Sequence, residues 1–208
     1  MSEIPEHIAR LKDVMSGFPE TWALCGGWAV DAFIGEETRR HDDVDILIIE
    51  DAQPAFFQHM QGWDMVAHDA TVWDGTDERW DGRALTLPAH VHIPAVFHYE
   101  ESGAISSRDG FAIDLQVNEA TGSEWVISRN EITVPLGKAF YQSDWGLPTV
   151  VPEVLLLYKA IERRRRDERD FQALLPRLSD TQRTWLHDAI ARLRHPWLDK
   201  LAAEAGES

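Results

Sequence analysis

Apolar residues recur along this chain with two different periods, and the longer period predicts helices. Residues 4–16 carry Ile4, Ile8, Leu11 and Met15 at spacings of four, three and four, which is the pattern of an amphipathic helix. Similar patterns predict helices over residues 27–34 and 54–61, and over several segments that follow Pro152.

Shorter apolar runs and a period of two predict strands in the first 150 residues. The expected strands cover residues 21–25, 43–49, 63–68, 84–98 and 111–117, with one or two more within 125–134. In residues 111–117 the apolar side chains share one face, and Asp114 stands on the other. Strands followed by helices predict an α+β protein, with a mixed β-sheet and flanking helices in 1–150 and a helical lobe in 151–208.

Charge is spread unevenly over these two parts. Residues 1–150 hold 26 acidic and 9 basic residues, a net charge of −17, whereas residues 151–208 have a net charge of +1. An acidic part of this kind repels nucleic acid and attracts a cationic substrate, although it also serves solubility. Neither an apolar signal segment nor a membrane-spanning run occurs, so a cytoplasmic location is expected.

One stretch, residues 25–47, combines two features that suit phosphate chemistry. Asp43 and Asp45 are two apart on a predicted strand, so their carboxylates point the same way and repel each other unless a cation lies between them. Oxygen ligands of this kind suit Mg²⁺. Gly26 and Gly27 precede a short helix, where backbone N–H groups can approach a phosphate.

The joined pattern resembles the signature of the nucleotidyltransferase superfamily, in which Gly-Gly is followed by Asp-x-Asp on the next strand. It is most similar to the antibiotic nucleotidyltransferases that adenylylate aminoglycosides and lincosamides. The residues that carry the resemblance are Trp28, Asp31, Gly35, Thr38, Arg39, His41, Asp42, Asp43 and Asp45. The resemblance implies a nucleotidyltransferase-type sheet in a catalytic domain, residues 1–150, followed by the helical lobe.

The resemblance also implies a third carboxylate on a neighbouring strand, for which Asp114 is the best-placed candidate. Asp109 and Glu100 are alternatives, and Asp114 could instead pair with an arginine across the sheet. ATP or another NTP would bind over Gly26 and Gly27, with two Mg²⁺ ions held by the three aspartates. A substrate hydroxyl would then attack the α-phosphorus, and pyrophosphate would leave.

Two cations are candidates for contact with the triphosphate. Arg39 belongs to the motif, although an ion pair with Asp31 or Asp42 is the alternative. The family often places a lysine at the position of Lys159, where it reaches the β- and γ-phosphates; the alternative is a solvent-facing lysine. The run Arg163–Arg166 is interpreted as a salt-bridged surface within a helix.

The sequence gives weaker indications of which residues bind the molecule that accepts the NMP group. Trp73, Asp74 and Trp80 lie in an acidic, tryptophan-rich loop that could bind an aminosugar, or could simply pack on the sheet. His90 and His92 share a strand face, but no third ligand follows at a spacing typical of zinc.

These features predict transfer of an NMP to a hydroxyl of a small cationic molecule, with an aminoglycoside-like antibiotic favoured. A lincosamide or another metabolite is the first alternative. A toxin-type enzyme that modifies tRNA or protein is the second, and the lack of a clear basic patch argues against tRNA. A non-catalytic nucleotide-binding protein is the third.

Overall fold

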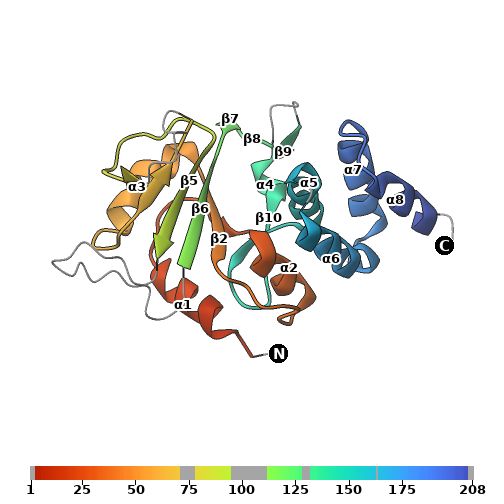
Figure 1. The fold of residues 1–208 in the computed structure, drawn as a ribbon, viewed down its shortest axis with the longest axis horizontal. Coiled ribbons are helices and arrows are strands. Elements are labelled where there is room, and N and C mark those ends of the chain that lie inside the picture. Colours follow the sequence, from red (N-terminus) through yellow and green to blue (C-terminus); the bar gives the residue numbers. More distant parts are fainter. Residues whose placement is uncertain (1–2, 71–77, 95–111, 128–131, 163, 206–208) are drawn as a thin grey trace.

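The fold is seen in a computed structural model that describes residues 3–70, 78–94, 112–127, 132–162 and 164–205. Its described strands form an eight-stranded mixed sheet in the order β10-β11-β1-β2-β6-β5-β3-β4, and a small sheet in the order β7-β8-β9 (Figure 1). The strands are β1 (Trp22–Leu24), β2 (Val44–Ile49), β3 (Val66–His68), β4 (Glu78–Arg79), β5 (Ala89–Pro94), β6 (Ala112–Asn118), β7 (Ala120–Thr121), β8 (Glu124–Val126), β9 (Thr133–Pro135), β10 (Phe140–Gln142) and β11 (Pro148–Val150).

The described helices gather in two places. In Figure 1, α1 and α3 accompany the sheet on the left, whereas α5 to α8 form a group on the right that adjoins α2. Their bounds are α1 (Glu6–Val14), α2 (Gly26–Ile34), α3 (Gln53–His59), α4 (Leu136–Ala139), α5 (Pro152–Glu162), α6 (Arg165–Leu174), α7 (Asp180–Ala191) and α8 (Trp197–Ala205), with 3₁₀ turns at η1 (Glu50–Ala52) and η2 (Leu175–Arg177). The predicted α+β class, with a mixed sheet and flanking helices, is confirmed.

Strand β6 separates an apolar face from a polar one, and β2 does so at its start, where buried Val44 precedes Asp45. Side chains alternate along β6, so that Ile113, Leu115 and Val117 are buried and Asp114 points the other way, as predicted. The buried face packs with α1 and α3 residues such as Ile8 and Phe56. Burial on one face fixes the register of both strands, and therefore fixes where their polar side chains emerge.

Several predicted bounds were wrong. Strand β5 begins at Ala89 rather than at residue 84, and β3 begins at Val66. Three short elements, α4, β10 and β11, have no counterpart in the prediction, because three or four residues carry too little periodic signal.

The arginine run does not lie inside one helix. Helix α5 ends at Glu162 and α6 begins at Arg165, and Arg164 between them has extended backbone, with φ −80° and ψ 156°. The side chain of Asp167 accepts a hydrogen bond from the backbone N–H of Arg164 at 2.7 Å, which caps α6. The interpretation of this run as part of a continuous helix is therefore wrong.

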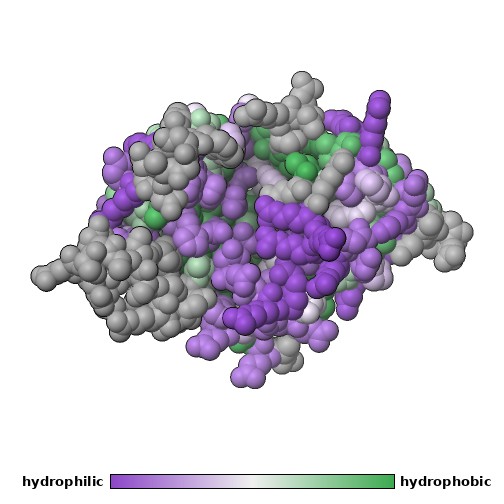
Figure 2. Space-filling view, viewed as in Figure 1, coloured by the Kyte–Doolittle hydropathy of each residue, from purple (hydrophilic) through white to green (hydrophobic). Residues whose placement is uncertain are grey.

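The surface in Figure 2 gathers its most hydrophilic side chains over the region where α2 and α6 meet in Figure 1. Among the described residues, no helix is both long enough and apolar enough to cross a membrane.

Candidate active site

Three carboxylates meet where β2 and β6 begin. The two strands are parallel neighbours, and their register places Asp45 directly beside Asp114. Asp43 lies one residue before β2. One carboxylate oxygen from each of the three residues lies within 4.8 Å of the other two. The structure thus brings together the three aspartates that the sequence singled out.

The electrostatics of this carboxylate cluster are unfavourable for negative charge. Burial, followed by the charges of Asp43 and Asp114, raises the pKa of Asp45 to about 6. Burial and the neighbouring Asp114 also raise the pKa of Asp43. Burial acts in the same direction on Asp114, but a hydrogen bond and charge from His92 outweigh it and lower the pKa of Asp114.

A divalent cation would relieve this repulsion. The donors are carboxylate oxygens only, they lie on or beside two hydrogen-bonded strands, and charge accumulates on them at neutral pH. Hard oxygen donors of this kind fit Mg²⁺.

The glycine pair brings the first turn of α2 onto these carboxylates. Gly26 has φ +64°, and a Cβ atom built on it would lie 1.9 Å from Asp45 Oδ2. A Cβ atom on Gly27 would lie 2.4 Å from His41 Nδ1. Close packing therefore requires both glycines, whether or not a phosphate binds there. The role of Gly26 and Gly27 in binding phosphate stays a prediction.

Cys25, at the N-cap of α2, has a buried thiol close to the carboxylate cluster. Its backbone N–H donates to the backbone oxygen of Asp45 at 2.9 Å. Burial, followed by the charge of Asp45, raises the pKa of its thiol, so the thiol stays protonated and is a poor nucleophile.

We expect Gly26→Ala to lose activity and to destabilise the protein. Alanine is strained at a positive φ, and its methyl group also displaces Asp45, so the free energy of unfolding should fall by about 3 kcal/mol. Gly122→Ala is the matched control, because Gly122 has φ +62° and a Cβ atom at that position would meet no atom within 4 Å. Urea unfolding of both variants separates the two costs, and equal losses would argue against the contact with Asp45.

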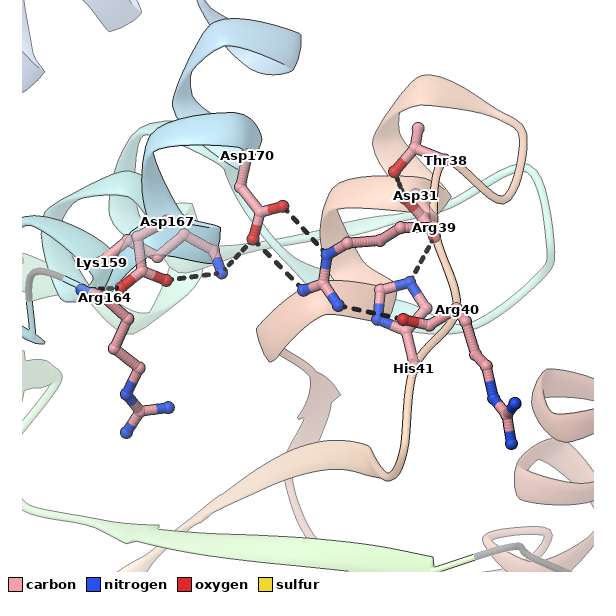
Figure 3. Close-up of polar contacts among 9 residues, drawn as sticks. All are labelled: Asp31, Thr38, Arg39, Arg40, His41, Lys159, Arg164, Asp167 and Asp170. Atoms are coloured by element: carbon pink, nitrogen blue, oxygen red, sulfur yellow. Dashed lines mark hydrogen bonds and ion pairs between the residues drawn. The ribbon is translucent and has the colours of Figure 1, made fainter.

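The loop between α2 and β2, residues 35–43, is called the motif loop below. Its contacts with Asp31, a fully buried residue of α2, hold it against the helix (Figure 3). Thr38 Oγ1 donates to Asp31 Oδ1 at 2.5 Å, and His41 Nε2 lies 2.5 Å from Asp31 Oδ2. The His41 ring also packs on Trp28, with 4.4 Å between ring centroids. These contacts give Thr38, Asp31 and His41 a structural role in holding the loop that leads to Asp43.

Arg39 and Lys159 share one buried carboxylate, that of Asp170 on α6 (Figure 3). Arg39 Nε lies 3.3 Å from Asp170 Oδ1, and Lys159 Nζ lies 2.6 Å from Asp170 Oδ2. Burial by itself would raise the pKa of Asp170, but Lys159 and Arg39 outweigh it and lower that pKa. The structure therefore pairs Arg39 with a residue that neither sequence alternative named.

Lys159 is only 8% exposed, so the alternative of a solvent-facing lysine is wrong. Its Nζ also lies 3.5 Å from Asp167 Oδ1, and its charge acts to lower the pKa of Asp45. Sequence reasoning missed Asp167 and Asp170 because they stand in a run of mixed charge that resembles a solvated surface. Their i,i+3 spacing, which places both on one helix face, was the available signal.

Arg166 is a further cation that sequence reasoning assigned to the surface. It is exposed on α6, and its charge acts to lower the pKa of both Asp43 and Asp45. Helix α6 therefore brings the charge of Arg166 within electrostatic range of the carboxylate cluster.

Asp170→Asn should weaken the link between the motif loop and the helices after Pro152. Arg39 and Lys159 both lose the negative charge that they share, and Lys159 is buried. We therefore expect the free energy of unfolding to fall by about 3 kcal/mol at pH 7. Because the pKa of Asp170 is lowered in the folded protein, its contribution is present above the ordinary pKa of an aspartate. That contribution is lost as the pH falls through the lowered value.

Glu168→Gln on the same helix is the control for this experiment. Glu168 pairs with Lys200 at the surface, where an ion pair contributes less than about 1 kcal/mol, and a glutamine keeps one oxygen that can accept from Trp197 Nε1. Urea unfolding at pH 7 compares the two variants, and a similar loss in both would contradict the importance of the buried pair.

Among the residues predicted to contact the acceptor, only Trp80 lies in the described part of the chain. Trp80 is 3% exposed, packs edge-on against Phe57 and donates from Nε1 to the backbone oxygen of Arg83 at 2.8 Å. This geometry favours the alternative of a residue packed on the sheet. The remaining candidates lie outside the described residues: Trp73 and Asp74 for the acceptor, and Glu100 and Asp109 for the third carboxylate.

Part of the chain is similar in sequence to a known protein family. Residues 7–73 match the model of the aminoglycoside-2''-adenylyltransferase family. No protein of curated function matches the chain in sequence.

Two solved structures share the fold at low sequence identity. The lincosamide antibiotic adenylyltransferase LnuA, solved with lincomycin bound, has a TM-score of 0.54 and 16% identity, covering 83% of this chain and 98% of its own. ANT(2'')-Ia in complex with adenylyl-2''-tobramycin has a TM-score of 0.55 and 13% identity, covering 91% of this chain and 99% of its own.

The match in sequence falls on the stretch that holds the glycine pair and the first two aspartates, and the match in fold extends over most of the chain. The resemblance predicted from the motif is thereby confirmed: the chain has the nucleotidyltransferase fold and is similar to the aminoglycoside and lincosamide adenylyltransferases.

Proposed function

We propose that this protein is a Mg²⁺-dependent enzyme that transfers an NMP, AMP from ATP, to a hydroxyl of a small cationic molecule, with an aminoglycoside-like antibiotic favoured. The observation that carries the proposal is the carboxylate cluster of Asp43, Asp45 and Asp114, held in register under the first turn of α2. The family match over residues 7–73 supports the adenylyl donor and the aminoglycoside-like acceptor.

The residues proposed to bind the NTP, which is the donor of the NMP group, take distinct roles. The backbone N–H groups at the start of α2 bind phosphate oxygens, as helix N-termini do. Arg39, Lys159 and Arg166 contact the triphosphate from the motif loop, α5 and α6. Mg²⁺ ions held by the three aspartates would neutralise charge on the triphosphate. Residues 1–150 thus form the catalytic domain, and residues 151–208 a lobe that adds cations.

Asp114 acts on the acceptor. The acceptor hydroxyl oxygen forms a bond to the α-phosphorus, the bond to pyrophosphate breaks, and the hydroxyl proton passes to Asp114. Asp114 is ionised at neutral pH, so its carboxylate has a lone pair free for that proton. Because the lowered pKa also makes it a weak base, the transfer depends on the position of Asp114 beside the hydroxyl.

The net charge of −17 on residues 1–150 supports a cationic acceptor, because it draws cations toward the site. The likeness to LnuA, solved with lincomycin bound, makes a lincosamide the second candidate.

The test is to incubate the protein with Mg²⁺, labelled ATP and separate panels of aminoglycosides, lincosamides and tRNA. Release of pyrophosphate that depends on an aminoglycoside is the expected result. Pyrophosphate release with only the lincosamides, or with only tRNA, would show that the acceptor is a lincosamide or tRNA instead of an aminoglycoside. ATP binding without release in any panel would favour a non-catalytic nucleotide-binding protein.

A further inference from the structure

Asp114 has a neighbour on the side away from Asp45. Strands β5 and β6 are antiparallel neighbours, and their register places His92 directly opposite Asp114. His92 Nδ1 lies 2.5 Å from Asp114 Oδ1. Because β2 and β6 place Asp45 on the other side of Asp114, the three side chains form one row across the sheet. Asp114 is thus held between a carboxylate and an imidazole.

This contact restrains the orientation of the Asp114 carboxylate, together with a hydrogen bond between Asp114 and Asp43. The terminal torsion of an aspartate is soft, so a carboxylate with no fixed partner samples a wide range of orientations. A hydrogen bond to Oδ1 selects one plane for the carboxylate, and therefore directs the lone pairs of both oxygens. The N–H dipole of the ring, directed at Oδ1, also opposes the repulsion that Asp43 and Asp45 exert on Asp114.

The His92 ring lies outside the hydrophobic core. Its side chain is 44% exposed, so its removal leaves no cavity in the core. Its neighbour His90 stands two residues earlier on the same face and acts on Asp114 through its charge, but its contact partners are different. His90 lies opposite Gln116 and stacks on His68, with 4.7 Å between ring centroids. His90 is therefore a matched control histidine, which faces a glutamine and shares with His92 a charge effect on Asp114 but not the hydrogen bond.

We propose that His92 is a positioning residue of the transfer reaction, which holds the Asp114 carboxylate in the orientation that receives the proton of the attacking hydroxyl. The proposal rests on the transfer function proposed above. His92 itself touches neither the nucleotide nor the reacting atoms in this role. It donates from Nδ1, and the proton of the hydroxyl passes to Asp114 while the new bond to phosphorus forms.

Three variants test this role. His92→Leu removes the donor, and we expect kcat to fall about 10- to 100-fold, the range for a residue that orients a ligating group. At saturating Mg²⁺, the KM for ATP should change less than about threefold, because the residues proposed to contact the triphosphate are unchanged. His92→Asn should recover most of kcat, since its side-chain N–H can stand where Nδ1 stands. His90→Leu should retain the activity of the unmodified enzyme.

A purely structural role for His92 would give a different pattern. The melting temperature would fall in His92→Leu, and kcat would follow the melting temperature in all three variants. An unchanged kcat in His92→Leu, or an equal loss in His92→Asn, would overturn the proposal.

Binding of Mn²⁺ alone separates this proposal from the proposed function. With no nucleotide or acceptor present, His92→Leu should weaken Mn²⁺ binding about tenfold, and His92→Asn and His90→Leu should not. If the unmodified protein transfers to no acceptor, the proposed function fails, yet the Mn²⁺ affinities still decide whether His92 positions Asp114. Equal Mn²⁺ affinity in all variants would refute the role of His92.

Discussion

Asp45→Asn should abolish nucleotidyl transfer and, in metal-free buffer at neutral pH, raise the melting temperature of the protein. Loss of a metal ligand at the reacting phosphate removes about 4 kcal/mol of transition-state stabilisation, or about a 1,000-fold fall in kcat. The rise in melting temperature has a separate origin, which is the cost of charge at this position. Burial and two neighbouring carboxylates raise the pKa of Asp45 from 3.8 to about 6.

The sign of the stability effect follows from that raised pKa. The folded protein holds a proton on Asp45 up to about pH 6, whereas the unfolded chain releases it near pH 3.8. Stability is therefore lost as the pH rises from about 3.8 through about 6, and the loss at pH 7 is about 3 kcal/mol. Asparagine carries no charge, so Asp45→Asn should recover this loss at pH 7 and show a smaller advantage near pH 4.

Scanning calorimetry at both pH values, with and without Mg²⁺, measures this effect. Mg²⁺ should raise the melting temperature of the unmodified protein and leave that of Asp45→Asn unchanged. Asp51→Asn, an exposed aspartate on η1, is the control and should alter neither activity nor melting temperature. A fall in the melting temperature of metal-free Asp45→Asn at pH 7 would contradict this account.

The same carboxylates show which parts of the site could be read from the sequence. Alternation in residues 111–117 predicts the face on which Asp114 stands, and the spacing of Asp43 and Asp45 predicts that the two act together. These are local properties of a strand, so a local pattern is enough. That β2 and β6 are neighbours in register is a property of the sheet, and only the family resemblance indicated it in advance.

His92 and Asp170 mark the limit of a local pattern. His90 and His92 have nearly the same surroundings in sequence, yet only His92 lies opposite Asp114. Asp170 lies 131 residues from Arg39 in the sequence, within a run of charged residues. Such runs more often form a solvated surface than a buried ion pair. Cross-strand register and contacts between helices decide both cases, and neither is encoded in the periodicity of one segment.

Asp114→Asn should lose transfer in a way that differs from Asp45→Asn. As the residue that receives the hydroxyl proton, Asp114 accounts for about 100- to 10,000-fold in kcat. Asp43 and Asp45 remain to face the triphosphate, so binding of a non-hydrolysable ATP analogue with Mg²⁺ should weaken less than about tenfold. Single-turnover transfer and equilibrium binding of the analogue separate the two steps. Near-normal turnover in Asp114→Asn would show that another residue accepts the proton.

The two variants should also shift stability in opposite directions, although the two aspartates are adjacent in the sheet. The hydrogen bond and charge of His92 hold the pKa of Asp114 below its ordinary value. Its contribution to stability is therefore present at neutral pH and is lost as the pH falls through the lowered pKa. Metal-free Asp114→Asn should melt at a lower temperature than the unmodified protein at pH 7, whereas Asp45→Asn should melt at a higher one. If both variants raised the melting temperature, repulsion within the cluster would outweigh the bond from His92 to Asp114.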